Sequence, residues 1–439
     1  MAKEFFGMLT YVTLSIFLVA FLLIVFEVFD KSIIALSGAL LMVIFGVLSP
    51  EEAIEAIEFE TILLLLAMML LVNIASKSGI FEWLNVKIAS LTKGNPLAIF
   101  LFFSVITAVF SAFLDNVTTV VLIVPLTIEL LRGMGKDPKP YVFAEIIFSN
   151  IGGGLTLIGD PPNIIIAGST GLSFLDFIVN LWIPILASMI LATVVFLVVY
   201  WKSLKPIATN LVKLCIANIT IKNIKRNFLK TTIHRDFVVK VILALLLTVV
   251  GFLFQHQIGL PNFVIAFAAA MFLGLVTAKR VDIHKAFESV EWTTLFFFAG
   301  LFIMVAGVEE TGLLDRLSEA VAGSTSNLFY LSLMILWVSG LVSMILDNIP
   351  FVTVMIPVIM GIQTHFPGTD TTILWWALSL GACLGGNGTL IGASANVVSA
   401  DIAKKNGVNI TFLNYMKFSL PLTIGILCIC SLYLFIRIG

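Results

Sequence analysis

The sequence predicts an all-α polytopic membrane protein built from inverted-topology repeats of five plus five transmembrane helices, with two re-entrant hairpins and two broken helices. Composition, a duplicated set of polar landmarks and the placement of charge predict it. Of the 439 residues, 60% are apolar and only 12% are charged, whereas a soluble domain carries about a quarter charged residues. Mean hydropathy is +1.11. Such a chain needs lipid as solvent, which excludes a soluble enzyme, a nucleic-acid-binding protein and a disordered chain.

Apolar runs follow one another along the chain. A hydrocarbon core about 30 Å thick needs about 20 apolar residues per helix. The first run, 9–29, is too long for a signal-peptide core and is interpreted as a retained helix. The remaining candidates are 32–49, 61–76, 97–114, 117–131, 141–168, 174–201, 236–255, 261–278, 293–308, 327–346, 349–362, 372–400 and 411–437. The four cysteines and four histidines are scattered, which argues against a disulfide framework or a zinc site.

One long polar loop, 202–235, divides the chain into a first membrane repeat (1–201) and a second, inverted one (236–439). The loop carries eight Lys or Arg residues up to Arg235 and no acidic residue. By the positive-inside rule we expect it to be a cytoplasmic linker.

The two halves repeat. When the second half is aligned with the first at an offset that changes by no more than one position, polar residues, glycines and prolines coincide. Similarity between two apolar sequences by chance would not align these residues. The aligned pairs are Thr61 with Thr294, Gly79 with Gly312, Asp115-Asn116 with Asp347-Asn348, Pro125 with Pro357, Gly152-Gly153 with Gly385-Gly386, Thr156 with Thr389, Gly159 with Gly392 and Asn163 with Asn396.

Loop charges give the relative orientation of the halves. Lys77, Lys87 and Lys93 mark a cytoplasmic loop, and the repeat partner of that loop is the mainly acidic stretch 309–319. Conversely, the acidic loop 50–60 corresponds to a loop with three basic residues. Because every loop changes side between the halves, the repeat is predicted to be inverted, a plan common among secondary transporters. Both termini are then extracytoplasmic.

The first pair of helix breaks lies at 113–119 and 345–351. Each contains Asp-Asn, whose side chains can cap the adjoining helices. The two apolar runs that flank each Asp-Asn begin and end on the same side of the membrane whether they cross it completely or form a re-entrant hairpin. The positive-inside rule therefore does not distinguish these two arrangements. The second arms, 117–131 and 349–362, are short and each contains a proline, which favours hairpins.

The second pair of breaks lies at 149–163 and 384–396. Three consecutive glycines in one, and Pro161-Pro162 after them, are incompatible with continuous helix. Unwound backbone at membrane depth is tolerated where it lines a cavity, where carbonyls bind cations and half-helix N-termini bind anions.

The candidate substrate and ion site combines these breaks. Asp115 and Asp347 are either caps or ion sites. Asp160 has Ala393 as its repeat partner and is the single carboxylate expected to couple transport to Na⁺ or H⁺, although Asp before Pro-Pro also begins ordinary helices.

Neutral polar residues at the same breaks complete the expected site, whereas Glu129 and Glu145 are interpreted as interfacial. The full set is Asp115, Asn116, Thr118, Thr119, Gly153, Thr156, Asp160, Asn163, Asp347, Asn348, Thr353, Asn387, Thr389, Ser394 and Asn396. A bound Na⁺ could lie at Asn116, Thr119, Asn348 and Asn387; no other cofactor and no catalytic residue is expected.

Two other classes of protein fit part of the pattern. An aspartic-protease dyad needs both aspartates in one shared site, but here they belong to oppositely oriented hairpins and each is followed by an Asn. An ion channel built from the same broken helices stays an alternative.

At these motifs the sequence resembles the ArsB/NhaD ion-transporter superfamily, which includes arsenical pump membrane proteins, citrate-transporter-like carriers and the P protein. The motifs that carry the resemblance, closest to the P-protein-like branch, are 114–119, 158–163, 346–350 and 385–396. The resemblance covers nearly the whole chain and implies an elevator-type carrier that forms a homodimer. Related divalent-anion carriers bind sodium and carboxylate at Ser-Asn-Thr tips, which 116–118 and 348–350 match only in part.

The expected function is secondary active transport of a small ion, arsenite or antimonite or another inorganic or organic anion, coupled to H⁺ or Na⁺ by alternating access. A Na⁺/H⁺ antiporter or an anion channel is the alternative. The expected partners are the lipid bilayer of the cell membrane, the small-ion substrate and, for an arsenite pump, a separate soluble ATPase, with no nucleic acid. The sequence does not identify the substrate.

Overall fold

The computed structural model describes residues 2–26, 29–205 and 235–438, and within them the only regular secondary structure is helical. The helices of the first half are α1 (Ala2–Val25), α2 (Lys31–Ile44), α3 (Pro50–Glu55), α4 (Phe59–Ser76), α5 (Ile80–Leu91), α6 (Pro96–Phe113), α7 (Asn116–Gly133), α8 (Lys139–Gly153), α9 (Pro161–Thr170), α10 (Phe174–Val199) and α11 (Trp201–Leu204). Most of the predicted linker, 206–234, lies outside the described residues.

The second half follows the same order of elements. Its helices are α13 (Arg235–Leu253), α14 (Gln255–Ile258), α15 (Asn262–Thr277), α16 (Ile283–Glu288), α17 (Trp292–Glu309), α18 (Leu313–Ser324), α19 (Leu328–Ser343), α20 (Asn348–Gln363), α21 (Ile373–Gly385), a short 3₁₀ turn η1 (Gly386–Gly388), α22 (Ser394–Lys405) and α23 (Phe412–Ile438). The shift that carries Thr61 onto Thr294 also carries both ends of α4 onto those of α17 and both ends of α5 onto those of α18.

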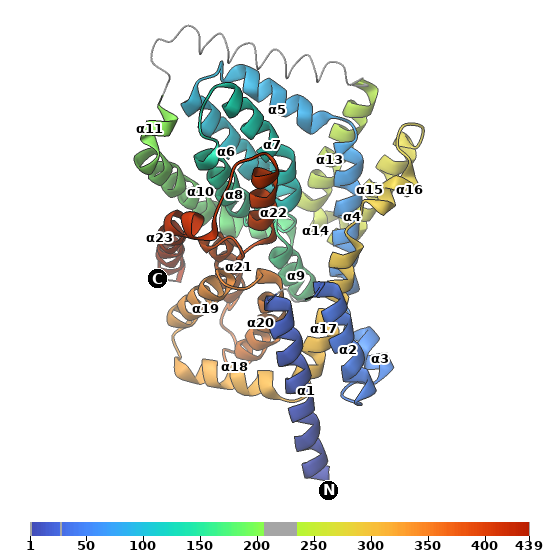
Figure 1. Ribbon diagram of the computed structural model, residues 1–439. Coiled ribbons are helices and arrows are strands. Elements are labelled where there is room, and N and C mark those ends of the chain that lie inside the picture. Colours follow the sequence, from blue (N-terminus) through green and yellow to red (C-terminus); the bar gives the residue numbers. More distant parts are fainter. Residues whose placement is uncertain (1, 27–28, 206–234, 439) are drawn as a thin grey trace.

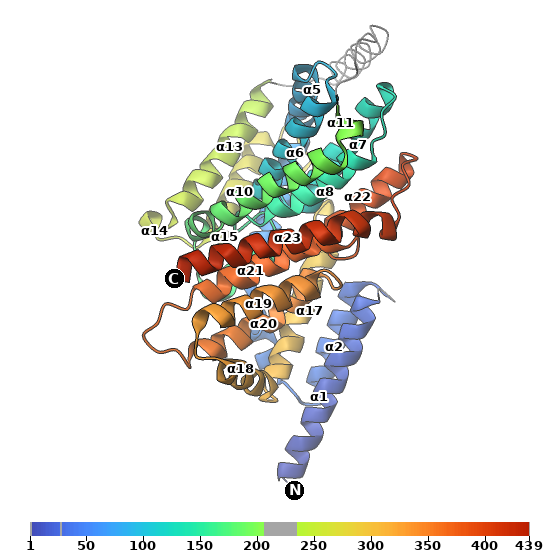
Figure 2. The same cartoon turned by 90° about the vertical axis from the view of Figure 1, so that its left-hand side faces the viewer.

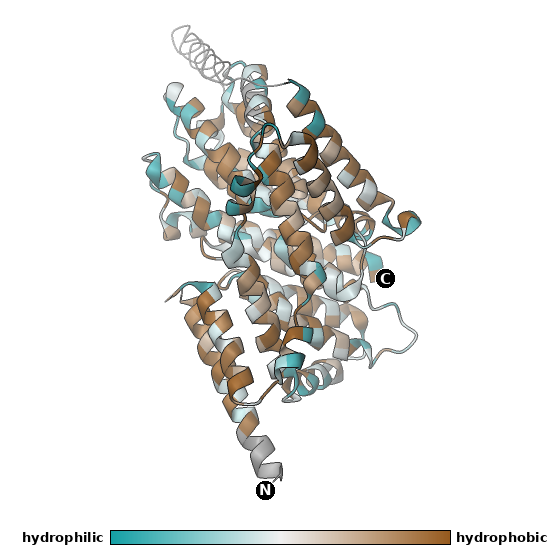
Figure 3. Ribbon diagram, turned by 90° about the vertical axis from the view of Figure 1, so that its right-hand side faces the viewer, coloured by the Kyte–Doolittle hydropathy of each residue, from teal (hydrophilic) through white to brown (hydrophobic). Residues whose placement is uncertain are grey.

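The all-α membrane fold is confirmed. Seven described helices are long and apolar enough to cross a membrane, namely α4, α6, α7, α10, α13, α17 and α23. Large apolar side chains such as Val198 and Leu275, each at least 74% exposed, cover the outside. Figure 3 shows that hydrophobic residues predominate along most of the helices. Because water would penalise such a surface, these faces are suited to contact with lipid.

The two halves interleave rather than lying side by side as separate domains. α2 packs on α17 and α15 on α4, while α7 packs against α22 and α20 against α9. The long last helices, α10 and α23, cross the molecule next to each other (Figure 2). Helices α5 and α18 lie at opposite ends of the molecule (Figure 1). Each of the packed pairs named above (α2–α17, α4–α15, α7–α22, α9–α20 and α10–α23) joins a helix of one half to a helix of the other.

Two helical hairpins occur at the predicted positions. α6 joins α7 through Leu114 and Asp115, and α19 joins α20 through residues 344–347. The aspartates cap the second arms, because Thr118 N–H donates to Asp115 (2.7 Å) and Ile349 N–H donates to Asp347 (3.4 Å). The first of these arms, α7, extends at both ends beyond the expected range 117–131, and Pro125 lies inside it without ending it.

Two helices are interrupted where glycine and proline predict it. α8 ends at Gly153 and α9 begins at Pro161; α21 ends at Gly385, with η1 and an extended segment before α22. An added Cβ on Gly152 would lie 2.2 Å from the backbone oxygen of Ala108, and one on Gly385 would lie 2.4 Å from that of Gly340. Glycine therefore lets each broken helix press directly on the first arm of its own half's hairpin.

Candidate functional site

A cavity of about 400 Å³ lies where the hairpin tips meet the broken helices. Both Asp-Asn tips line it, as do the starts of α9 and α22. Residues from α2 and the start of α17 close its other side. The polar side chains that line it include Asp30, Lys31, Ser32, Asn73, Asp115, Asn116, Thr118, Asp160, Ser289, Glu291, Thr293, Thr294, Asp347, Asn348 and Ser394. Segments from the beginning of the first half and the middle of the second thus share one compartment.

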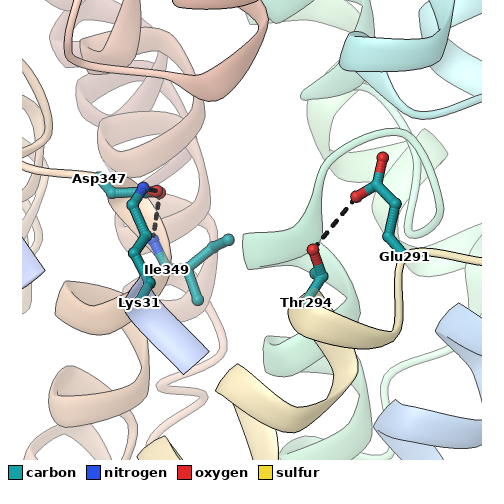
Figure 4. A network of polar contacts seen from close by, with 5 residues as sticks. All are labelled: Lys31, Glu291, Thr294, Asp347 and Ile349. Atoms are coloured by element: carbon teal, nitrogen blue, oxygen red, sulfur yellow. Dashed lines mark hydrogen bonds and ion pairs between the residues drawn. The ribbon is translucent and has the colours of Figure 1, made fainter. Parts of the chain in front are cut away.

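Among the described residues, one ion pair with a short distance lies in the cavity. Lys31 Nζ lies 2.7 Å from Asp347 Oδ2, and Figure 4 shows the lysine reaching across from α2 to the second tip. On the opposite side Thr294 donates to Glu291 at 3.1 Å. Among the described residues the lining has five carboxylates and one basic side chain, so acidic charge predominates unless protons or cations occupy the site.

Asp160 differs from the other carboxylates. It is only 2% exposed yet lines the cavity. Its Oδ1 accepts a long hydrogen bond (3.4 Å) from Asn116, and its Oδ2 has no hydrogen-bond partner among the described residues. Although it precedes α9, its side chain makes no cap bond, so the interpretation of Asp160 as an ordinary helix start does not account for it. A buried carboxyl oxygen in this condition favours a proton or a cation.

A chain of asparagine side chains joins the two halves behind the cavity. Asn150 accepts from Asn116 (3.1 Å) and donates to Asn387 (2.9 Å) and Asn396 (2.8 Å). All four are at most 5% exposed. The amide of Asn150 therefore links the first hairpin tip with the second broken helix.

Several predicted residues hold the unwound backbone instead of facing the cavity. Thr156 donates to the carbonyl of Ala112, and the repeat-equivalent Thr389 donates to that of Met344. Asn163 and Asn396 each donate to the carbonyl of the threonine seven positions before them, at 3.0 and 2.8 Å. The threonines satisfy carbonyls at the end of the first hairpin arms, and the asparagines satisfy carbonyls that the broken helices leave free.

The structure thus divides the predicted residues into two sets. Seven line the cavity: Asp115, Asn116, Thr118, Asp160, Asp347, Asn348 and Ser394. Eight lie outside its lining: Thr119, Gly153, Thr156, Asn163, Thr353, Asn387, Thr389 and Asn396. Of the four expected Na⁺ ligands, only Asn116 and Asn348 line the cavity. Thr119 Oγ1 and Asn387 Nδ2 are buried and have no partner among the described residues.

Sequence reasoning missed other members. Lys31 begins an apolar run and gives no local signal, because its partner lies 316 positions away. Asn150 stands inside the predicted break and could have been included on that ground. Glu145, which the sequence places near the membrane interface, is buried inside the protein: it is 1% exposed and accepts a hydrogen bond from Thr127.

Comparison with known proteins agrees with this architecture. Residues 21–381 match the family model described as citrate transporter, CitMHS. The chain belongs to the citrate transporter family. It is 36% identical to the 46 kDa membrane protein of Mycobacterium leprae over 97% of this chain and 98% of that protein. It is 33% identical to the human P protein over 94% of this chain, which spans 58% of that longer protein.

The fold also resembles a solved transporter. The Alcanivorax borkumensis YdaH transporter superposes with a TM-score of 0.56 at 18% identity, covering 86% of this chain and 85% of that one. The family recognition made from the motifs is confirmed, and the chain is a multi-pass membrane transporter.

Proposed function

We propose that this transporter carries a small anion through the cavity by alternating access, with H⁺ or Na⁺ as the coupling ion. One observation carries the proposal: Asp160 lines a cavity that both hairpin tips also line, and one of its carboxyl oxygens is buried without a partner among the described residues. Such an oxygen is stabilised when it binds a proton or cation, and half-helix ends around it suit an ion.

A carboxylate is the first substrate class to test, because the family description is citrate transporter. Lys31 supplies the cavity with the positive charge that an anion requires, whereas the surrounding carboxylates require neutralisation before an anion enters. This combination favours transport of the anion together with a coupling cation. Arsenite, antimonite and inorganic anions belong in the same panel.

The experiment is flux through purified protein in liposomes. Uptake of labelled citrate, succinate, sulfate and arsenite is measured under an imposed Na⁺ or pH gradient, with empty liposomes as the control. We expect saturable uptake of one anion that depends on one gradient. Passive current without coupling-ion dependence would favour a channel, and Na⁺-driven pH change without any anion would favour a Na⁺/H⁺ antiporter.

The membrane arrangement belongs to the same proposal. We propose ten crossings in an inverted arrangement, an elevator-type motion, a homodimer, extracytoplasmic termini and a cytoplasmic 202–235 linker in the cell membrane. The hairpins are proposed to be re-entrant, which is supported by the presence of both tips at one internal cavity. Labelling of single cysteines placed at each terminus, from either side of sealed vesicles, tests the orientation. A soluble ATPase partner is proposed only if arsenite proves to be the substrate.

A further inference from the structure

Lys31 occupies an unusual place for a lysine. It is the first residue of α2, a 14-residue helix that begins at the cavity. The N-terminus of a helix carries partial positive charge, which disfavours a cation and favours an anion. Asp30 caps this end by accepting from Ser32 N–H (2.9 Å). The ammonium itself extends beyond the cap into the cavity.

The ammonium of Lys31 already holds a carboxylate. Asp347 Oδ2 lies 2.7 Å from Nζ, with the two side chains 31% and 14% exposed. Among the described residues, the remaining oxygen of Asp347 accepts a single long hydrogen bond (3.4 Å) from Ile349 N–H. The carboxylate of Asp347 is therefore chemically equivalent to the carboxylate of an incoming anion, and it occupies the basic group that such an anion needs.

The duplicated fold does not require this ion pair. The shift that carries Thr61 onto Thr294 carries Lys31 onto the apolar Val264 of α15, and Asp115 at the first tip forms no ion pair with a described Lys or Arg. Asp115 instead accepts from both the N–H and the hydroxyl of Thr118. Lys31 is thus a single addition to one half, placed against one tip.

The ion pair also joins parts that otherwise barely touch. α2 packs on α1 and α17, and in the described residues it has no substantial packing contact with α19 or α20. Asp347 belongs to the connection between those two helices. A partly exposed ion pair is weak, so a charged ligand with more than one carboxylate can displace it.

We propose that Lys31 is the anion-binding residue of the cavity and that Asp347 is an internal competitor, which holds Lys31 until the substrate anion replaces it. Substrate binding then frees the α19–α20 tip from α2. This inference rests on the proposed anion transport and identifies the group that recognises the anion.

The test uses citrate as the probe, with binding to the full-length purified protein followed by the thermal-unfolding midpoint and uptake followed in liposomes at fixed pH and Na⁺. Lys31→Met keeps the length of the side chain without its charge and is expected to weaken citrate binding at least about tenfold. Lys31→Arg is expected to retain most of it. Asp347→Asn removes the competitor and is expected to tighten binding severalfold.

The decisive measurement is the double variant. If Asp347 competes for Lys31, Asp347→Asn tightens binding when Lys31 is present and has no effect in the Lys31→Met background. The matched control is the exposed ion pair between Lys405 and Asp401 (2.6 Å), whose variants Lys405→Met and Asp401→Asn should leave citrate binding unchanged. Elution as one folded species in size-exclusion chromatography separates loss of binding from loss of fold.

Two results overturn the inference in different ways. Wild-type citrate affinity in folded Lys31→Met, or weaker binding in Asp347→Asn, refutes the competitor model while leaving anion transport in place. Absence of binding and uptake of every anion in the wild-type protein refutes the proposed function and the role of Lys31 together.

Discussion

The two halves of the site share a backbone and differ in charge. At the break of the first half stands Asp160, whereas the second half has Ala393. The first tip carries Asp115 without a described ion pair, while Asp347 at the second tip is neutralised by Lys31. The hydrogen bonds that support the breaks, by contrast, recur almost atom for atom. The two halves therefore share the hydrogen bonds that support the interrupted helices, and they differ in the charged side chains that they bring to the cavity.

The largest expected effect tests the shared backbone. Gly152→Ala and Gly385→Ala place a Cβ 2.2 and 2.4 Å from backbone oxygens of the neighbouring helix. The backbones of the two packed helices cannot move apart easily, so each variant is expected to lose about 3 kcal/mol or more of folding stability. The yield of folded protein and its thermal-unfolding midpoint measure this loss.

The matched control for these variants is Gly323→Ala in α18, where no atom lies within 4 Å of the added Cβ. That change should leave the midpoint unchanged or raise it slightly. If only one of the two close-contact variants destabilised the protein, the halves would not share the same backbone requirement.

Asp160→Asn tests the charge difference. The variant removes the titratable oxygen but keeps the side-chain volume, so we expect folding to persist and gradient-driven uptake to fall at least about tenfold. Asp160→Ala introduces the residue that the second half has at this position, Ala393, and we expect it to reduce uptake to a similar extent. Uptake with the wild-type rate and pH dependence would remove Asp160 from the coupling mechanism.

Thr156→Val and Thr389→Val should cost similar amounts, about 1–2 kcal/mol each. Each removes the hydroxyl that satisfies one backbone carbonyl between a hairpin and its broken helix. Equilibrium or thermal unfolding of both variants under one detergent condition measures the comparison. A difference above about 2 kcal/mol would contradict the equivalence of the two supports.

The smallest expected effect concerns Glu145, which is buried against Thr127 and has Leu378 as its repeat partner. Glu145→Gln should keep the hydrogen bond from the Thr127 hydroxyl and change stability by less than about 1 kcal/mol, with uptake unchanged. Loss of the pH dependence of uptake in this variant would show that proton coupling is not confined to Asp160.

Much of this architecture could be predicted from local sequence. Gly152-Gly153 and Pro161-Pro162 cannot continue a helix, and Asp-Asn between apolar runs predicts a capped tip, so both pairs of breaks were expected at the right residues. The recurrence of these signals at one nearly constant shift also predicted the repeat. Asp160 was singled out because its repeat partner is apolar.

The remainder depends on tertiary contacts. The pairing of Lys31 with Asp347 spans the chain, and no periodicity announces it. Residues 140–153 of α8 are buried on every side, so this helix has no polar face to reveal whether Glu145 points to water or to protein. The sequence places Thr156 and Asn163 at the substrate site, but the Thr156 hydroxyl satisfies a carbonyl of the hairpin arm and the Asn163 amide satisfies a carbonyl of the unwound segment.

The close glycine contacts have a mechanical consequence. Because Gly152 lies on the backbone of Ala108 and Gly385 on that of Gly340, neither hairpin can slide along its own broken helix. The Asn150 amide ties the two broken helices to each other. These contacts hold the four segments to one another, so the proposed alternating access would place its movement at the boundary between them and helices such as α2, α4 and α17.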